Sequence, residues 1–81
     1  MTEESVKQRI ESGLVGSQVQ VLDTKGTGDH FSVVVISDDF EGKSLVKRHQ
    51  MIYATVSDVL TKELHALQLK TYSNKEWKQE N

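Results

Sequence analysis

The sequence of 81 residues contains no cysteine, no long hydrophobic run and no excess of positive charge. Without cysteine, one chain forms no disulfide, offers no thiolate nucleophile and builds no cysteine-based zinc or iron–sulfur site of its own. The longest apolar run, residues 33–36, is far too short to span a membrane. The net charge of −2 excludes a general attraction to nucleic acid or anionic lipid.

Targeting and catalytic motifs are also missing. The acidic, polar start Met1-Thr2-Glu3-Glu4 is neither a secretory signal nor a transit peptide, so we expect a cytoplasmic protein. There is no Gly-x-Ser-x-Gly elbow, no Gly-x-x-x-x-Gly-Lys loop and no Gly-x-Gly-x-x-Gly fingerprint. We therefore expect a protein that is not an enzyme.

Hydrophobic periodicity divides the chain into elements. Apolar residues at helical spacing predict amphipathic helices over residues 3–12 and 44–62. Alternation or β-branched runs predict strands over residues 18–21, 31–36 and 65–70. The length fits one domain, residues 1–81, with a small core that buries ~60–65% of the unfolded surface.

A third helix is predicted around Trp77, because Ser73 and Glu76 have the spacing of a capping box. The order is then αββαβα. The first two strands form a hairpin, and the crossover through the long helix makes the third strand parallel to the second. Both faces of the second strand are apolar, which favours a central position. The sequence thus predicts an α+β fold, a three-stranded mixed sheet packed against helices.

Each of the three histidines has two interpretations. His49 lies on the apolar stripe of the long helix, which favours a core histidine with a hydrogen-bonded ring. His30 falls where the glycine turn meets the second strand, a place typical of an exposed strand edge. His65 follows a predicted helix end, where its ring can contact the last carbonyls. Metal ligation is the alternative for each, although no pair has the i, i+4 spacing of a helical zinc site.

Lys43, Lys47 and Arg48 form a basic cluster at the start of the long helix. Such a cluster either contacts phosphate or is an ordinary solvated helix face. The αββαβα order is compatible with a KH-like domain, whose nucleic-acid site needs a Gly-x-x-Gly clamp. The one such spacing, residues 13–16, ends a helix ahead of the first strand and lacks basic residues.

Several short motifs follow one another in a characteristic order. They are Asp29-His30-Phe31, Val33-Val34-Val35-Ile36-Ser37, Phe40-Glu41-Gly42-Lys43, Arg48-His49, Tyr53, His65-Ala66-Leu67, Lys70-Thr71-Tyr72 and Glu76-Trp77. Together they resemble the BolA family over more than half of the chain. Two departures are Gln50, where the family often has arginine, and Ser73-Asn74-Lys75-Glu76, where it often has Thr-Pro-Glu.

The resemblance implies a KH-like (type II) fold without the nucleic-acid clamp. It also implies a partner, a monothiol glutaredoxin of the Cys-Gly-Phe-Ser (CGFS) type, with which the protein shares a 2Fe–2S cluster. The glutaredoxin supplies its cysteine and a bound glutathione thiolate. His65, in the Leu-His-Ala motif, is then one metal ligand, and His30 is the best match for the second. The expected function is a non-enzymatic adaptor for iron–sulfur trafficking or iron sensing, which alone is a monomer or weak homodimer.

On this interpretation, the partner docks on Lys43, Lys47, Arg48 and His49 and on the edge of the third strand. The rival interpretation is a small DNA-binding transcriptional regulator, as some BolA proteins are described. The acidic net charge, the missing clamp and Gln50 argue against strong DNA binding. A third alternative is an interaction module whose histidines are structural.

Overall fold

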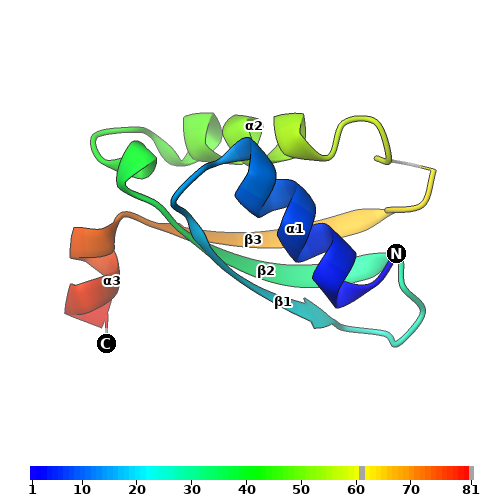
Figure 1. Cartoon of the computed structure of the whole chain (residues 1–81). Helices are drawn as coiled ribbons and strands as arrows, with labels where there is room; N and C mark the ends of the chain where they lie inside the picture. The colour runs from blue at the N-terminus through cyan, green and yellow to red at the C-terminus, as the bar shows by residue number, and fades with distance from the viewer. Residues whose placement is uncertain (61, 81) are drawn as a thin grey trace.

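The computed structural model describes residues 1–60 and 62–80 (Figure 1). The elements in chain order are α1 (Glu3–Gly13), β1 (Gln18–Asp23), β2 (His30–Ile36), the short 3-10 helix η1 (Asp38–Phe40), α2 (Leu45–Thr55), β3 (Ala66–Tyr72) and α3 (Asn74–Glu80). The predicted α+β class and αββαβα order are confirmed. The predicted domain 1–81 also includes residues 61 and 81, and the predicted long helix includes residue 61; both residues lie outside the described part.

The sheet has the order β1-β2-β3, so β2 is central, as its apolar faces predict. β1 pairs with β2 in antiparallel fashion, and β2 pairs with β3 in parallel. The parallel register places His30 opposite Ala66 at one end of the sheet and Ile36 opposite Tyr72 at the other. The starts of β2 and β3 therefore lie side by side, although they are far apart in sequence.

The hydrophobic core lies between the sheet and the two long helices, which cover the same face (Figure 1). Its buried members are Val6, Ile10, Leu14, Val19, Phe31, Val33, Val35, Phe40, Ile52, Val56, Val59 and Leu64. On the opposite face of β2, Ile36 is buried and Val34 half-buried. α3 lies at the Ile36 end of the sheet, so this second face is covered only in part (Figure 1).

The long helix is shorter than predicted. It begins after Ser44, whose side chain caps it, and ends at Thr55 rather than at Lys62. A helix over residues 44–62 would be about 27 Å long, whereas a seven-residue strand spans about 20 Å. The chain must turn back at the end of the sheet to start β3, and buried Val56, Val59 and Leu64 hold that turn in the core.

The buried stripe of α2 also differs from the prediction. The helical spacing of Leu45, His49, Ile52 and Val56 predicts that Leu45 begins the apolar stripe, but Leu45 is 61% exposed, whereas Arg48 is buried at 8%. Leu45 lies in the first turn of the helix, three residues before Arg48 and seven before Ile52, and these two buried residues define the face that meets the core. The helix therefore buries a charged residue, and that charge needs a partner.

The first and last helices both have a capping box, and the one at Ser73 and Glu76 confirms the prediction. Thr2 caps α1 through a reciprocal pair of hydrogen bonds with Ser5. The Ser73 hydroxyl accepts the amide of Glu76, and the Glu76 carboxylate accepts the amide of Ser73. These bonds satisfy backbone donors that a helix start leaves open.

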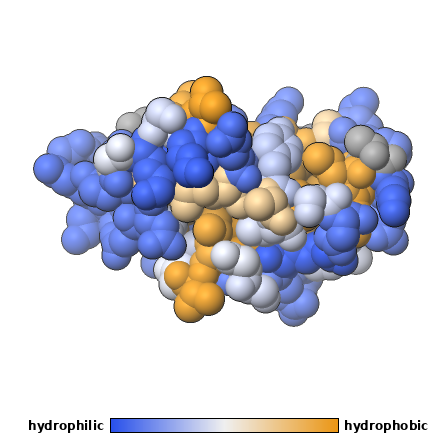
Figure 2. All heavy atoms as spheres, turned by 90° about the horizontal axis from the view of Figure 1, so that it is seen from above, coloured by the Kyte–Doolittle hydropathy of each residue, from blue (hydrophilic) through white to orange (hydrophobic). Residues whose placement is uncertain are grey.

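The helical side of the molecule is mostly hydrophilic, with hydrophobic side chains in separate groups (Figure 2). The large hydrophobic residues that remain exposed are Val15, Leu22, Leu45 and Val46. Within the described residues, no helix combines the length and apolar character needed to cross a bilayer.

Candidate metal centre

His30 and His65 meet at one end of the sheet. His30 is the first residue of β2 and pairs in register with Ala66, the first residue of β3. His65 directly precedes Ala66, so the parallel pairing brings it beside His30. The two ring centroids are 6.2 Å apart, with the ring planes inclined at 35°. The structure therefore brings together the two residues that the resemblance implies as metal ligands.

Asp29 contacts both histidines. Its carboxylate oxygen Oδ1 lies 2.8 Å from Nδ1 of His30 and also accepts the hydroxyl of Thr27. Its backbone carbonyl accepts the amide of His65 at 2.8 Å and that of Ala66 at 3.1 Å. The hydrogen bond from Thr27, and next that from His30, lower the pKa of Asp29 to about 2.

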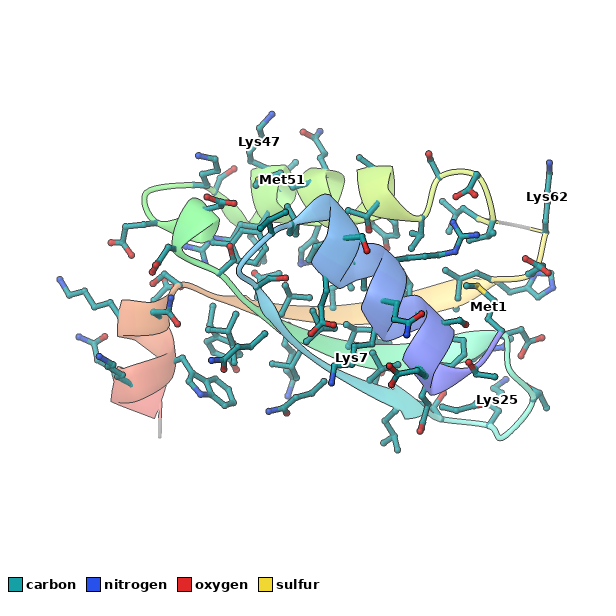
Figure 3. All side chains as sticks on the ribbon, in the orientation of Figure 1. Met1, Lys7, Lys25, Lys47, Met51 and Lys62 are labelled. Carbon is teal, nitrogen blue, oxygen red and sulfur yellow. The ribbon has the colours of Figure 1, made fainter. Side chains whose placement is uncertain are left out.

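The loop between β1 and β2 carries His30, and Asp23 organises it. The Asp23 carboxylate accepts the amides of Gly26 at 2.8 Å and Gly28 at 2.9 Å. Both glycines have positive φ, 71° and 76°, a region that other L-residues rarely adopt. The amino group of Met1 donates to the carbonyl of Gly28 at 2.7 Å, and Figure 3 shows Met1 and Lys25 at this end of the molecule.

The pair can supply part of a metal coordination shell. His30 is half-buried and His65 exposed, so both are open to a ligand from solvent. A metal-bound nitrogen lies ~2.1 Å from its ion, so two imidazoles on one ion have ring centres roughly 5–6 Å apart. Because Nδ1 of His30 faces Asp29, the ring nitrogen that remains for a metal is Nε2.

The described residues contain no group of three or more histidine, cysteine, aspartate or glutamate side chains that could hold a metal ion. Two imidazoles are therefore half of the usual tetrahedral set. A metal or cluster at this site needs its remaining ligands from another molecule, and the absence of cysteine means that any thiolate comes from there too.

The non-metal interpretations of these two histidines are only partly right. His65 was expected to contact the last carbonyls of the long helix, but α2 ends ten residues earlier, at Thr55. Its backbone amide instead binds Asp29. His30 does lie at a strand end, yet its ring is fixed by a carboxylate rather than simply exposed.

The predicted docking residues at the start of α2 do not form one surface. Lys43 and Lys47 are exposed, but Arg48 is buried. Its two terminal nitrogens contact the two carboxylate oxygens of Glu76 at 2.7 and 3.1 Å, and its Nε donates to the carbonyl of Lys43. The Arg48 guanidinium is the main cause that lowers the pKa of Glu76 to about 2. Arg48 therefore joins α2 to α3 and is not available to a partner.

His49 is half-buried, as its place on the helix indicates. The expectation of a hydrogen-bonded ring is wrong for Nε2, which is buried and has no hydrogen-bond partner among the described residues. This nitrogen faces protein rather than a partner surface.

The docking residues and the histidine pair lie at opposite ends of the sheet. α2 starts after β2 has ended, whereas His30 is where β2 begins, and seven strand residues span about 20 Å. Figure 3 shows Lys47 above the start of α2, left of centre, and Lys62 and Met1 at the right-hand end of the molecule. The sequence patterns predict neither this separation, nor the role of Asp29, nor the pairing of Glu76 with Arg48. An aspartate directly before a histidine is the one signal of this site in the sequence.

Comparisons with known proteins agree with this fold. A family model described as BolA-like protein matches residues 3–76. The DNA-binding transcriptional regulator BolA of Escherichia coli is 34% identical over 84 residues, covering 95% of this chain and 80% of that protein. Protein BOLA2 of Arabidopsis thaliana is 38% identical over 80 residues, covering 96% and 85%. The structure of a bolA protein homologue from Coxiella burnetii has a TM-score of 0.80 at 37% identity, covering 96% and 97%. The chain belongs to the BolA family.

Proposed function

We propose that this protein is a non-enzymatic adaptor for iron–sulfur trafficking or iron sensing, which shares a 2Fe–2S cluster with a CGFS monothiol glutaredoxin. His65 and His30 supply imidazole ligands, and the glutaredoxin supplies its cysteine and a bound glutathione thiolate. The observation that carries the proposal is the pairing of these two histidines, 6.2 Å apart between ring centroids, at an accessible end of a chain without cysteine.

The chemistry of the donor set supports a shared cluster. Iron–sulfur clusters are usually held by four thiolates, but two histidines can replace two cysteines on one iron. This chain offers two imidazoles and no thiol. The cluster is therefore cargo held between two proteins. A cytoplasmic location fits this function, because the cytoplasm keeps the partner's thiols reduced and so able to bind iron.

To test this, the protein is mixed with the glutaredoxin of its own organism, glutathione, iron and sulfide. Assembly of the cluster is then followed by visible absorption and circular dichroism. We expect a spectrum distinct from that of glutaredoxin alone, and we expect His65→Ala to remove it. His49→Gln is the matched control, because His49 lies in the middle of α2 and its Nε2 is buried, so that nitrogen is not open to a ligand. If the spectrum in the mixture equals that of glutaredoxin alone and no complex elutes from a sizing column, the proposal is wrong.

A second candidate function is DNA binding in transcriptional regulation. The observation that favours it is the name of the Escherichia coli relative, together with exposed Lys43 and Lys47 at the start of α2. With Arg48 buried, two phosphate contacts would give a slope of only about −1.8 in log K against log salt. We expect a duplex titrated at several salt concentrations to show this shallow slope, and Lys43→Gln/Lys47→Gln to flatten it. Equal slopes in the two proteins would exclude these lysines as phosphate contacts.

A further inference from the structure

We propose that Asp29 is the positioning residue of the metal centre, which fixes the orientation of His30 through its carboxylate and the place of His65 through its backbone carbonyl. This inference rests on the proposed function, since it assigns a role relative to the two ligands. It makes the histidine pair one prearranged unit rather than two independent side chains.

The carboxylate determines which nitrogen of His30 faces a metal. An ionised carboxylate only accepts hydrogen bonds, so the nitrogen facing it at 2.8 Å, Nδ1, carries the proton. The lone pair for a metal is then on Nε2. Thr27 donates its hydroxyl to the same carboxylate oxygen, which holds the acceptor in place. Both Asp29 and His30 side chains are about one-third exposed, at 31% and 32%, so a partner can still reach the ring.

The backbone of Asp29 acts on the other histidine. Its carbonyl accepts two amides, those of His65 and Ala66, where β3 begins. These bonds belong to the main chain and survive any side-chain change at position 29. The two links can therefore be separated by experiment: the side chain controls the ring of His30, and the backbone controls the position of His65.

A purely structural role for the carboxylate does not explain these contacts. Both of its hydrogen bonds go to side chains, those of Thr27 and His30. The amides of the loop are held by a different carboxylate, that of Asp23. A hydrogen-bonded side-chain pair as exposed as this one adds little to stability. Asp23→Asn is thus a matched control, which changes the same loop without touching His30.

The first test uses the free protein and needs no cluster. Nitrogen-15 NMR of the imidazole rings, at pH ~8.5 where ordinary imidazoles are neutral, reports which ring nitrogen carries the proton. We expect His30 to be protonated on Nδ1 in the natural protein and to shift toward the Nε2-protonated form in Asp29→Ala. The tautomer of His65 should be unchanged in that variant. The tautomers of both rings should be unchanged in Asp23→Asn, although the altered loop shifts the His30 resonances. An unchanged His30 tautomer in Asp29→Ala overturns the inference, as does a joint change of both histidines in Asp23→Asn.

The second test measures how long the shared cluster lasts. Loss of a residue that orients a ligand costs about 10–100-fold in metal affinity. We therefore expect the cluster on the heterodimer to decay about tenfold faster with Asp29→Ala than with Asp23→Asn. Equal decay in the two variants overturns the role of Asp29 in ligation. If the natural protein forms no shared cluster, the proposed function fails, while the tautomer measurement still decides whether Asp29 orients His30.

Discussion

The two ends of the sheet each hold a carboxylate whose pKa is lowered to about 2 by hydrogen bonds, but the two carboxylates face different partners. Asp29 contacts His30, which is half-buried and open to a ligand. Glu76 contacts Arg48, which is 8% exposed and lies under α3. One carboxylate thus binds a histidine that we propose as a metal ligand, and the other joins two helices. The two carboxylates are alike in their lowered pKa, so the difference in role comes from their partners: Arg48 is buried, whereas His30 is only half-buried.

This comparison explains why the pair Arg48-His49 is misleading as a docking motif. Arg48 lies over the ring of Phe40, with 5.7 Å from its guanidinium carbon to the ring centroid, and it bonds to the backbone of Lys43. Every one of these contacts is internal. The end of the molecule near α3 is therefore a structural end, and the end with His30 and His65 is the one that we expect to bind.

The largest expected effect is that of Arg48→Met on stability. Methionine fills similar volume but removes the donor to the carbonyls of Lys43 and Thr71. It also removes both guanidinium bonds to Glu76, whose carboxylate then keeps only the amide of Ser73. We expect the free energy of unfolding to fall by about 2–3 kcal/mol in urea titration. Cluster assembly per folded molecule should be unchanged, because the histidine pair is at the other end.

Lys47→Met is the control for this change. Lys47 is an exposed neighbour on the same helix, so its substitution should alter stability by no more than ~0.5 kcal/mol. If Arg48→Met were as stable as the natural protein, the contrast between a structural and a binding end would be wrong. A loss of cluster assembly in folded Arg48→Met would place the docking surface at α2 after all.

A smaller loss of stability is expected from Gly28→Ala, in the loop at the histidine end of the sheet. Gly28 has φ of 76°, and a Cβ atom there would lie 2.7 Å from the backbone oxygen of Met1. The left-handed conformation alone costs about 1–2 kcal/mol. Gly26→Ala is the matched control, since Gly26 has φ of 71° and nothing within 4 Å of the added Cβ. The difference between the two variants in urea titration measures the contact with Met1.

We expect Gly28→Ala to cost more than Gly26→Ala and also to disturb the His30 resonance in NMR, since the loop carries that residue. If the two variants lose equal stability, the approach of Met1 to the loop contributes nothing. In that case the hydrogen bonds of Asp23, Thr24 and Thr27 are what hold this loop.

Much of the fold could be predicted from the sequence, because hydrophobic spacing states which face of each element is buried. Val6 and Ile10 in α1 and the β-branched run of β2 are of this kind. The end of α2 at Thr55 could not be predicted, because no glycine or proline marks it in the sequence. The helix ends there because the neighbouring strands are only seven residues long. The burial of Arg48 was equally hidden, because its partner Glu76 is 28 positions away and arginine is usually exposed.

The site could be predicted only in part. The resemblance pointed to His65 and His30, but their proximity depends on the parallel register of β2 and β3, which no local spacing encodes. Asp29 stands next to His30 in the chain, yet its carbonyl bond to His65 appears only when the two strands pair. The contacts of His65 with Asp29 and His30 form only when β2 and β3 pair in this register, so the sequence alone does not predict them.

The smallest expected effect is on the pH dependence of stability. It tests how much the carboxylate at the α3 end of the sheet, Glu76, contributes to that dependence. The pKa of Glu76 is about 2 in the folded protein and 4.5 ordinarily. Because the folded value is the lower one, the stabilisation by Arg48 is complete above the ordinary pKa and is lost as the pH falls from there toward 2. We expect the urea midpoint to decline as the pH falls over this window, and to decline less steeply in Glu76→Gln.

The control is Asp58→Asn, which breaks an exposed pair with Arg9 and should leave the slope of the urea midpoint against pH nearly unchanged. A slope in Glu76→Gln equal to that of the natural protein would show that the pair adds nothing; a shallower slope leaves the remainder to other carboxylates, Asp29 among them, whose pKa is also about 2.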